Sequence, residues 1–88
     1  MKINPNFIIR NIAGELVIVP TGTAAQHFNG MITVNSVAGF MWEHMEECPN
    51  PDEMIKLVLS EFEVDEATAK KDVMEFLTSL KKIGMIDF

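Results

Sequence analysis

Residues 29–42, NGMITVNSVAGFMW, mark the change from a strand-forming to a helix-forming composition. Asn29-Gly30 tolerates positive φ angles at both positions, which a two-residue type I′ turn requires. Residues 31–34 are rich in β-branched side chains and predict a short strand, and Asn35 or Ser36 can cap a helix that follows it. Gly, Pro and β-branched residues dominate before this stretch, whereas Glu, Lys, Leu and Met dominate after it. We therefore expect strands first and helices second, in an α+β domain.

Two more strands are predicted upstream, over Phe7–Ile12 and residues 16–19, with a short Gly-containing turn between them. Residues 25–28 are then expected to lead into the Asn29-Gly30 turn. Both upstream strands are apolar on both faces. Because helices can cover only one face, the other face is expected to meet another segment or a second chain.

Three helices are predicted in the second half of the chain. The first begins at Asn35 or Ser36 and ends near Cys48. Asn50 caps the second helix, and Asp65 caps the third, which stops at Gly84. Residues 85–88 are expected to fold back as a short strand or an extended tail. The third helix has the clearest apolar stripe: Ala69, Val73, Phe76, Leu77, Leu80 and Ile83. Three antiparallel strands followed by three helices, the last two joined by a tight turn, form the outline of a winged helix-turn-helix.

Length and composition exclude several classes of protein. The 88 residues allow one domain, residues 1–88, and their 48% apolar content against 23% charged is not that of a disordered chain. No apolar run approaches the ~18–20 residues of a membrane span, and no secretory signal is evident, so we expect a cytoplasmic protein without a membrane partner. The formal charge of −6 argues against a general nucleic-acid binder.

No constellation of catalytic residues is evident. His44 and Cys48 lie four positions apart and could form a thiol–imidazole pair or two metal ligands, but no third residue has the spacing to complete a site. We therefore predict that both pack on the apolar side of the first helix. The sequence has no Gly-rich phosphate loop and no cysteine cluster, so we expect a protein that is not an enzyme and holds no metal or cofactor.

Two binding functions remain for a domain of this outline. In a DNA-binding regulator the third helix would read the groove, but that helix has no Arg and carries acidic residues among its lysines. A peptide binder would instead use the edge of the short third strand, where unpaired N–H and C=O groups accept an incoming strand. Lys70, Met74, Thr78 and Lys81 form an amphipathic row next to Leu77 that suits the wall of a groove. A third option is a subunit that forms a homodimer through its N-terminal hairpin.

The sequence resembles the PqqD family, the small protein of pyrroloquinoline quinone biosynthesis and the type example of the recognition element in pathways that modify ribosomally made peptides. The resemblance extends from about Phe7 to Ile86. It is carried by residues 16–20, by residues 28–35, by residues 38–43, and by the closing pattern Val73-x-x-Phe76-Leu77-x-x-Leu80-x-x-x-Gly84-Met85-Ile86.

The resemblance implies that the leader of a precursor peptide docks as an added strand and is delivered to a modifying enzyme, often a radical S-adenosylmethionine enzyme. It places the strand at Met31, Ile32, Thr33 and Val34 and the groove wall at Lys70, Met74, Leu77 and Lys81. The two lysines would favour an acidic leader.

Overall fold

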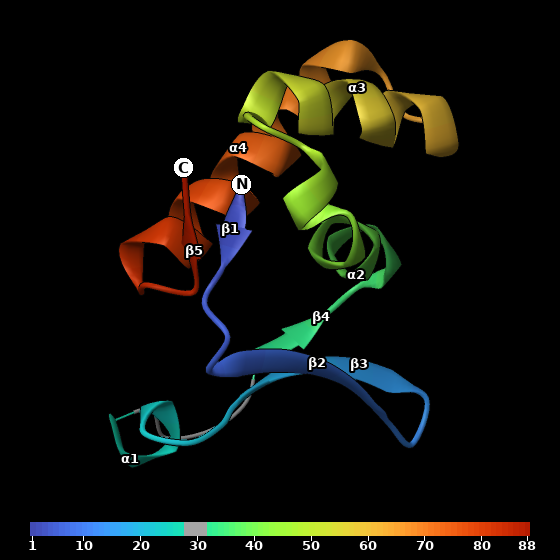
Figure 1. Cartoon of the computed structure of the whole chain (residues 1–88). Helices are drawn as coiled ribbons and strands as arrows, with labels where there is room; N and C mark the ends of the chain where they lie inside the picture. The colour runs from blue at the N-terminus through green and yellow to red at the C-terminus, as the bar shows by residue number, and fades with distance from the viewer. Residues whose placement is uncertain (28–31) are drawn as a thin grey trace.

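A three-stranded antiparallel sheet forms one layer of the fold, and helices form the other (Figure 1). The computed structural model describes residues 1–27 and 32–88. The sheet has the order β2-β3-β4, with β2 at Phe7–Ile12, β3 at Glu15–Pro20 and β4 at Ile32–Val34. This confirms the α+β fold class and the three-stranded antiparallel sheet. The predicted Asn29-Gly30 turn and Met31 lie outside the described residues.

The β2–β3 hairpin closes through the two-residue turn Ala13 and Gly14. Their φ angles are +53° and +84°, the pair of positive values that a type I′ turn needs. The side chain of Asn11 accepts a hydrogen bond from the Gly14 N–H at 3.1 Å. This turn fixes the register of the sheet from Ile12 opposite Glu15 to Phe7 opposite Pro20.

Three helices lie on one side of the sheet: α2 (Ser36–Glu43), α3 (Pro51–Glu61) and α4 (Glu66–Lys82). Of these, α2 packs next to β4, and α3 packs on α4 farther from the sheet. Each helix has an N-cap side chain that accepts a hydrogen bond from the backbone N–H three residues later. The caps are Asn35, Asn50 and Asp65, with donor–acceptor distances of 2.8, 3.0 and 2.6 Å. Such caps satisfy backbone donors that would otherwise lack partners. The sequence predicted Asn50 and Asp65 as caps, and of the two candidates for the first helix, Asn35 and Ser36, the cap is Asn35.

Two segments differ from the sequence-based expectation. Ala24–His27 forms a short helix, α1, in place of an extended approach to the turn, and it begins with Ala24 N–H donating to Thr21 O. The helix predicted to reach Cys48 ends at Glu43 and is followed by the 3-10 turn η1 (Met45–Glu47). The Met1 ammonium group donates to the carbonyl oxygens of Met45 and Cys48, which are therefore turned toward the N-terminus.

A second, two-stranded sheet joins the chain ends. β1 (Lys2–Ile3) pairs antiparallel with β5 (Ile86–Asp87), so the predicted C-terminal return is a strand, while its partner β1 was not predicted. Asn4 N–H extends the pairing by donating to Met85 O at 2.8 Å. The two termini thus lie side by side against α4 (Figure 1).

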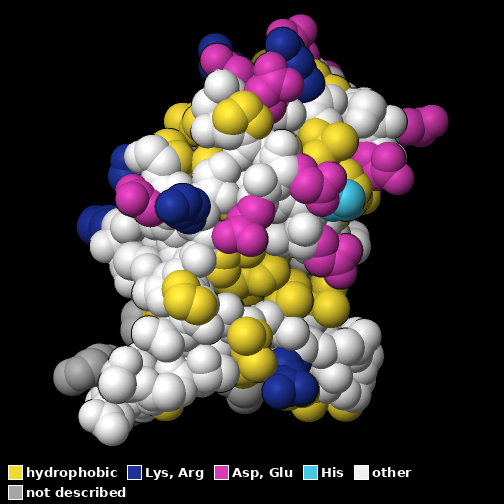
Figure 2. All heavy atoms as spheres, in the orientation of Figure 1, with side chains coloured by type: hydrophobic (Ala, Val, Ile, Leu, Met, Phe, Trp, Pro, Cys, Tyr) yellow, Lys and Arg dark blue, Asp and Glu magenta, His cyan; other side chains and the backbone are white. Residues whose placement is uncertain are grey.

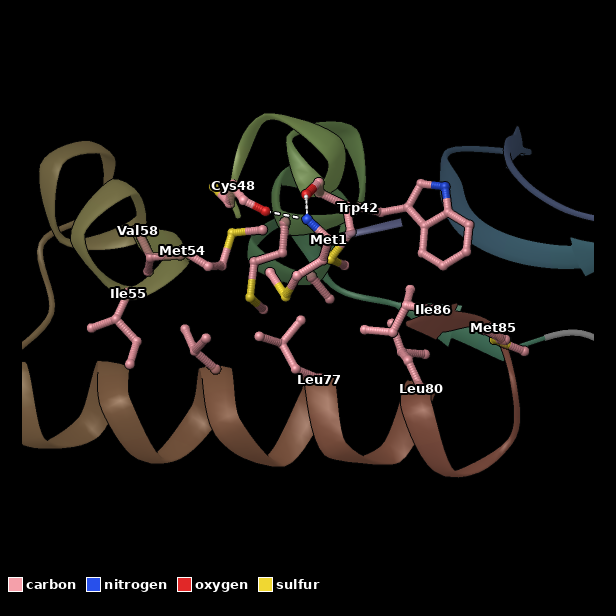
Figure 3. Packing of buried hydrophobic residues seen from close by; sticks show 14 of the residues in the cluster. Met1, Trp42, Cys48, Met54, Ile55, Val58, Leu77, Leu80, Met85 and Ile86 are labelled. Atoms are coloured by element: carbon pink, nitrogen blue, oxygen red, sulfur yellow. Dashed lines mark hydrogen bonds between the residues drawn. The ribbon is translucent and has the colours of Figure 1, made fainter. Parts of the chain in front are cut away.

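One apolar core connects the helices with both sheets. Figure 3 shows Leu77 and Leu80 of α4 pointing into a cluster that also holds Ile55 of α3 and Ile86 of β5. Leu77 is 0% exposed, as are Ile18 of β3 and Met54 of α3. The stripe predicted for the third helix is therefore the part of α4 that holds the helix against the rest of the domain.

Replacing Leu77 by alanine should lower the free energy of unfolding by about 2–5 kcal/mol, because it leaves a cavity at a fully buried site. The matched variant Met74→Ala, three residues away on the exposed side of α4, should cost less than about 1 kcal/mol. Urea unfolding followed by circular dichroism measures both values. Equal losses for the two variants would contradict this assignment of the core.

Asp65 should make the stability depend on pH. Hydrogen bonding from Thr68, through its hydroxyl and its backbone N–H, lowers the pKa of Asp65 from its ordinary value of 3.8. The charged cap therefore adds stability above the carboxyl's unfolded pKa, and this part is lost as the pH falls through the lowered pKa of the folded state. Asp65→Asn keeps a capping oxygen without the charge. We expect the stability difference between wild type and this variant to shrink on acidification below pH 3.8, measured by urea unfolding across that range. A difference independent of pH would contradict the assigned cause.

Candidate functional site

The two residues with the most reactive side chains have separate structural partners. His44 Nδ1 lies 2.8 Å from the Glu47 carboxylate, and the imidazole ring packs on Phe40 with 4.4 Å between ring centroids. Cys48 is buried, and this burial raises the pKa of its thiol. Burial and a raised thiol pKa are typical of a structural cysteine rather than of a nucleophile.

Within the described residues, no group of three or more His, Cys, Asp or Glu side chains is placed to bind a metal ion. None of the helices described has the length and apolar character needed to cross a membrane.

The sheet itself offers backbone groups for binding, and the hairpin determines which ones. In a two-residue hairpin the residues that flank the turn, here Ile12 and Glu15, exchange hydrogen bonds, and every second pair along the ladder does the same. At the other end of the hairpin Thr21 N–H donates to Asn6 O at 2.6 Å, which fits this alternation. The odd-numbered residues of β3 therefore bond to β2, and the even-numbered residues face β4.

The same alternation determines which N–H and C=O groups of β4 point toward β3 and which point away from it. Leu16 and Ile18 of β3 are the residues that bond to β4, and their partners in the register are Val34 and Ile32. Thr33, between these partners, consequently turns its N–H and C=O away from β3. In the described part of the chain β4 pairs with β3 alone, so these two groups lie on a free edge of the sheet. The predicted edge strand is therefore present at Ile32–Val34.

A cavity begins where β4 ends. It has a volume of about 620 Å³ and lies between the start of α2, the end of α3 and one flank of α4. Asn35, the residue directly after β4 and the cap of α2, is part of its lining. A chain that extends the sheet along β4 and continues past Asn35 would meet this cavity. Its other lining residues are Val37, Ala38, Met41, Val58, Phe62, Glu63, Val64, Ala69, Asp72, Val73, Glu75, Phe76 and Ser79.

The structure places the residues of the predicted groove wall away from this cavity. Leu77 is fully buried and belongs to the core rather than to a surface. Lys70, Met74 and Lys81 are exposed but are not among the residues that line the cavity beside β4. The flank of α4 that borders this cavity is the opposite one, with Phe76 as its large apolar side chain.

The predicted row lies beside the C-terminal segment instead. Met74 and Lys81 line a shallower hollow together with Phe88. The ammonium group of Lys81 is 4.3 Å from the centre of the Phe88 ring and donates to the Phe88 O at 2.6 Å. Lys81 is therefore already engaged with a neighbouring segment of its own chain.

One feature of the sequence indicates which flank of α4 borders the cavity. Phe76 widens the apolar stripe of α4 on one side, whereas Met74 is the only large apolar residue of this helix on the other. A stripe that is widened on one side shows where a helix meets a further apolar surface. Sequence reasoning assigned Phe76 to the core, and it is half-buried at the cavity.

Comparisons with known proteins agree with this architecture. The sequence profile of the family described as "Coenzyme PQQ synthesis protein D (PqqD)" matches residues 15–86. No curated protein sequence gives a significant match.

Two solved structures have a similar fold. "TbiB1 in Complex with the TbiA(beta) Leader Peptide" is 24% identical, with a TM-score of 0.74 over 99% of this chain and 95% of that one. "Lasso peptide synthetase B1 complexed with the leader peptide" is 21% identical, with a TM-score of 0.73 over 99% and 96%. At these identities the likeness establishes the fold. The profile match covers most of the length of the chain, and it includes β4, which forms the free edge, and the helices α2, α3 and α4, which border the cavity. The chain belongs to the PqqD family.

Proposed function

We propose that this chain is a non-catalytic peptide-binding protein of a pathway that modifies ribosomally made peptides. It binds the leader of a precursor peptide as an added strand on β4 and presents the precursor to a modifying enzyme, such as a radical S-adenosylmethionine enzyme. We place this function in the cytoplasm, where precursor peptides are synthesised.

The observation that carries the proposal is the free backbone of Thr33 next to the cavity. Because Thr33 directs its N–H and C=O away from β3, an incoming chain can hydrogen-bond to the sheet without displacing a strand. β2 is also an edge of the sheet, but it is β4 that leads through Asn35 into the cavity. Backbone pairing supplies register, and the cavity supplies a place for side chains that distinguish one peptide from another.

The relatives support the same function. Both similar structures are described as complexes of their proteins with a leader peptide. A peptide loses conformational freedom when it binds in an extended form, which costs a few kcal/mol. A short strand such as β4 therefore needs the additional apolar contacts that the cavity offers.

The charges around the cavity disfavour the alternative of a DNA-binding regulator. Asp72 and Glu75 lie on the flank of α4 that borders the cavity, and Glu63 lies in the turn that precedes α4. In a winged helix-turn-helix that binds DNA, this helix would approach the phosphate backbone, which carboxylates repel. The acidic side chains that gather on the helical layer of the face in Figure 2 add to this repulsion.

Thr33→Pro tests strand addition directly. Proline removes the N–H that faces the free edge, while the Ile32 and Val34 bonds to β3 remain, so the fold should persist. Peptides selected on the wild-type protein from a random display library are the probe. We expect their affinity to fall roughly tenfold, because an incoming carbonyl group loses its partner. Fluorescence anisotropy measures the affinity.

Two variants control this experiment. Thr33→Val retains the N–H and should bind like wild type. Ile9→Pro removes the corresponding outward N–H from β2, the opposite edge of the sheet, and leaves the hydrogen bond from Gly14 to Asn11 in the turn, so it should also bind like wild type. Circular dichroism confirms that each variant is folded. If the selected peptides bind folded Thr33→Pro as tightly as wild type, β4 is not the docking strand.

A further inference from the structure

We infer that the cavity beside β4 selects a basic leader segment, in which a large apolar side chain is followed or preceded two positions away by lysine or arginine. This inference rests on the proposed function and specifies the chemistry of the peptide. It reverses the sign of charge that the lysine row on α4 led us to expect.

The floor of the cavity is apolar. Met41 of α2, Val58 of α3 and Val73 of α4 are each at most 2% exposed and form its base. Phe62 and Phe76 are half-buried and stand higher on its sides. Phe62 is held by an edge-to-face contact with Phe40, with 5.2 Å between ring centroids. A preformed apolar surface of this kind binds a large aliphatic or aromatic side chain.

The charged residues at the rim of the cavity are all acidic. Glu63, Asp72 and Glu75 line the cavity and are exposed, and no Lys, Arg or His is among the lining residues. The ion pairs found within the described residues use Glu47 and Glu53 and none of these three. The three carboxylates therefore have no cationic partner from the described part of the chain, and a cation on the ligand can supply one.

The end of α3 adds to this negative potential. The last turn of α3 contains no basic residue, and the residues that follow its end, Phe62 and Glu63, line the cavity. The carbonyl end of a helix carries a partial negative charge that favours cations within about one turn. The last turn of α4, in contrast, contains Lys81 and Lys82. Because the last turn of α3 has no such residue, a cation of the ligand can interact with the C-terminal end of this helix.

The spacing of the two side chains follows from strand geometry. Alternate residues of an extended chain point to the same side, about 6–7 Å apart. A peptide that leaves the β4 edge in extended form thus directs residues i and i+2 toward the same surface. The aliphatic stem of lysine or arginine can lie along the side of Phe76 while its charged end reaches the carboxylates.

Selection followed by titration tests the inference. A display library of random peptides is selected on the full chain, and peptides that also bind Thr33→Pro are discarded. The most enriched peptide is synthesised and titrated against wild type and against the triple variant Glu63→Gln, Asp72→Asn, Glu75→Gln, which removes the charges and keeps the shapes. A matched triple variant, Glu15→Gln, Glu43→Gln, Asp87→Asn, removes the same charge away from the cavity. A second peptide, with its lysine or arginine changed to glutamate, is titrated against wild type and needs no variant protein.

We expect enriched peptides to contain the apolar and basic pair, and the cavity variant to bind the chosen peptide about three- to tenfold more weakly than wild type. The matched variant should bind it like wild type, and the charge-reversed peptide should lose affinity to at least the extent seen with the cavity variant. If peptides that need the Thr33 edge prove acidic or neutral, or bind both triple variants equally, the inference is overturned and the proposed function stands. If no peptide that depends on Thr33 is enriched, the proposed function fails and the inference fails with it.

Discussion

The proposed function of this small domain depends on the alternation of hydrogen bonds in an antiparallel ladder. The type I′ turn at Ala13 and Gly14 determines which residues of β3 bond to β2. The alternate residues of β3 then bond to β4, so the turn also determines the bonding pattern of β4. Thr33 is the residue of β4 that is left facing outward. A change of one residue in the register would turn Thr33 inward and expose the backbone of Ile32 and Val34 instead, and it would also move the apolar side chains of β4 off the core face. The core packing of β4 and the binding potential of its edge are thus specified by the same register.

The helix α2, which borders the cavity, lies very close to the sheet. A Cβ atom on Gly39 would lie 2.5 Å from Cδ1 of Leu16, so only glycine at this position allows α2 to approach β3 without moving the leucine. The start of α2, with its cap Asn35, comes directly after β4 in the chain. The turn from strand to helix takes one residue, and that residue borders both the free edge and the cavity. A longer connection would separate the two parts of the site.

The sequence specified most of the local structure but only part of the site. Caps, turns and apolar stripes act over a few residues, so Asn50, Asp65 and the buried face of α4 were predictable. The β1–β5 pair was not, because two-residue strands have no detectable alternation and depend on contacts between the chain ends. The helix predicted to reach Cys48 ends at Glu43 instead, and the Met1 ammonium group binds the carbonyl oxygens of Met45 and Cys48 beyond its end, a contact between distant parts of the chain that periodicity does not reveal. The strand of the site was predicted from turn chemistry, but the flank of α4 that faces it depends on how three helices pack, which periodicity alone does not specify.

The acidic flank of α4 that borders the cavity has the same sign of charge as the chain as a whole. An acidic leader would have to approach a protein with a formal charge of −6 and bind through a small patch of lysines, one of which already contacts Phe88. A basic leader is attracted at long range by the whole molecule and at short range by the carboxylates of the cavity. The same negative field repels nucleic acid from the helix that related folds use for DNA. Net charge, the charge of the cavity and the end of α3 therefore favour the same ligand, a basic extended peptide.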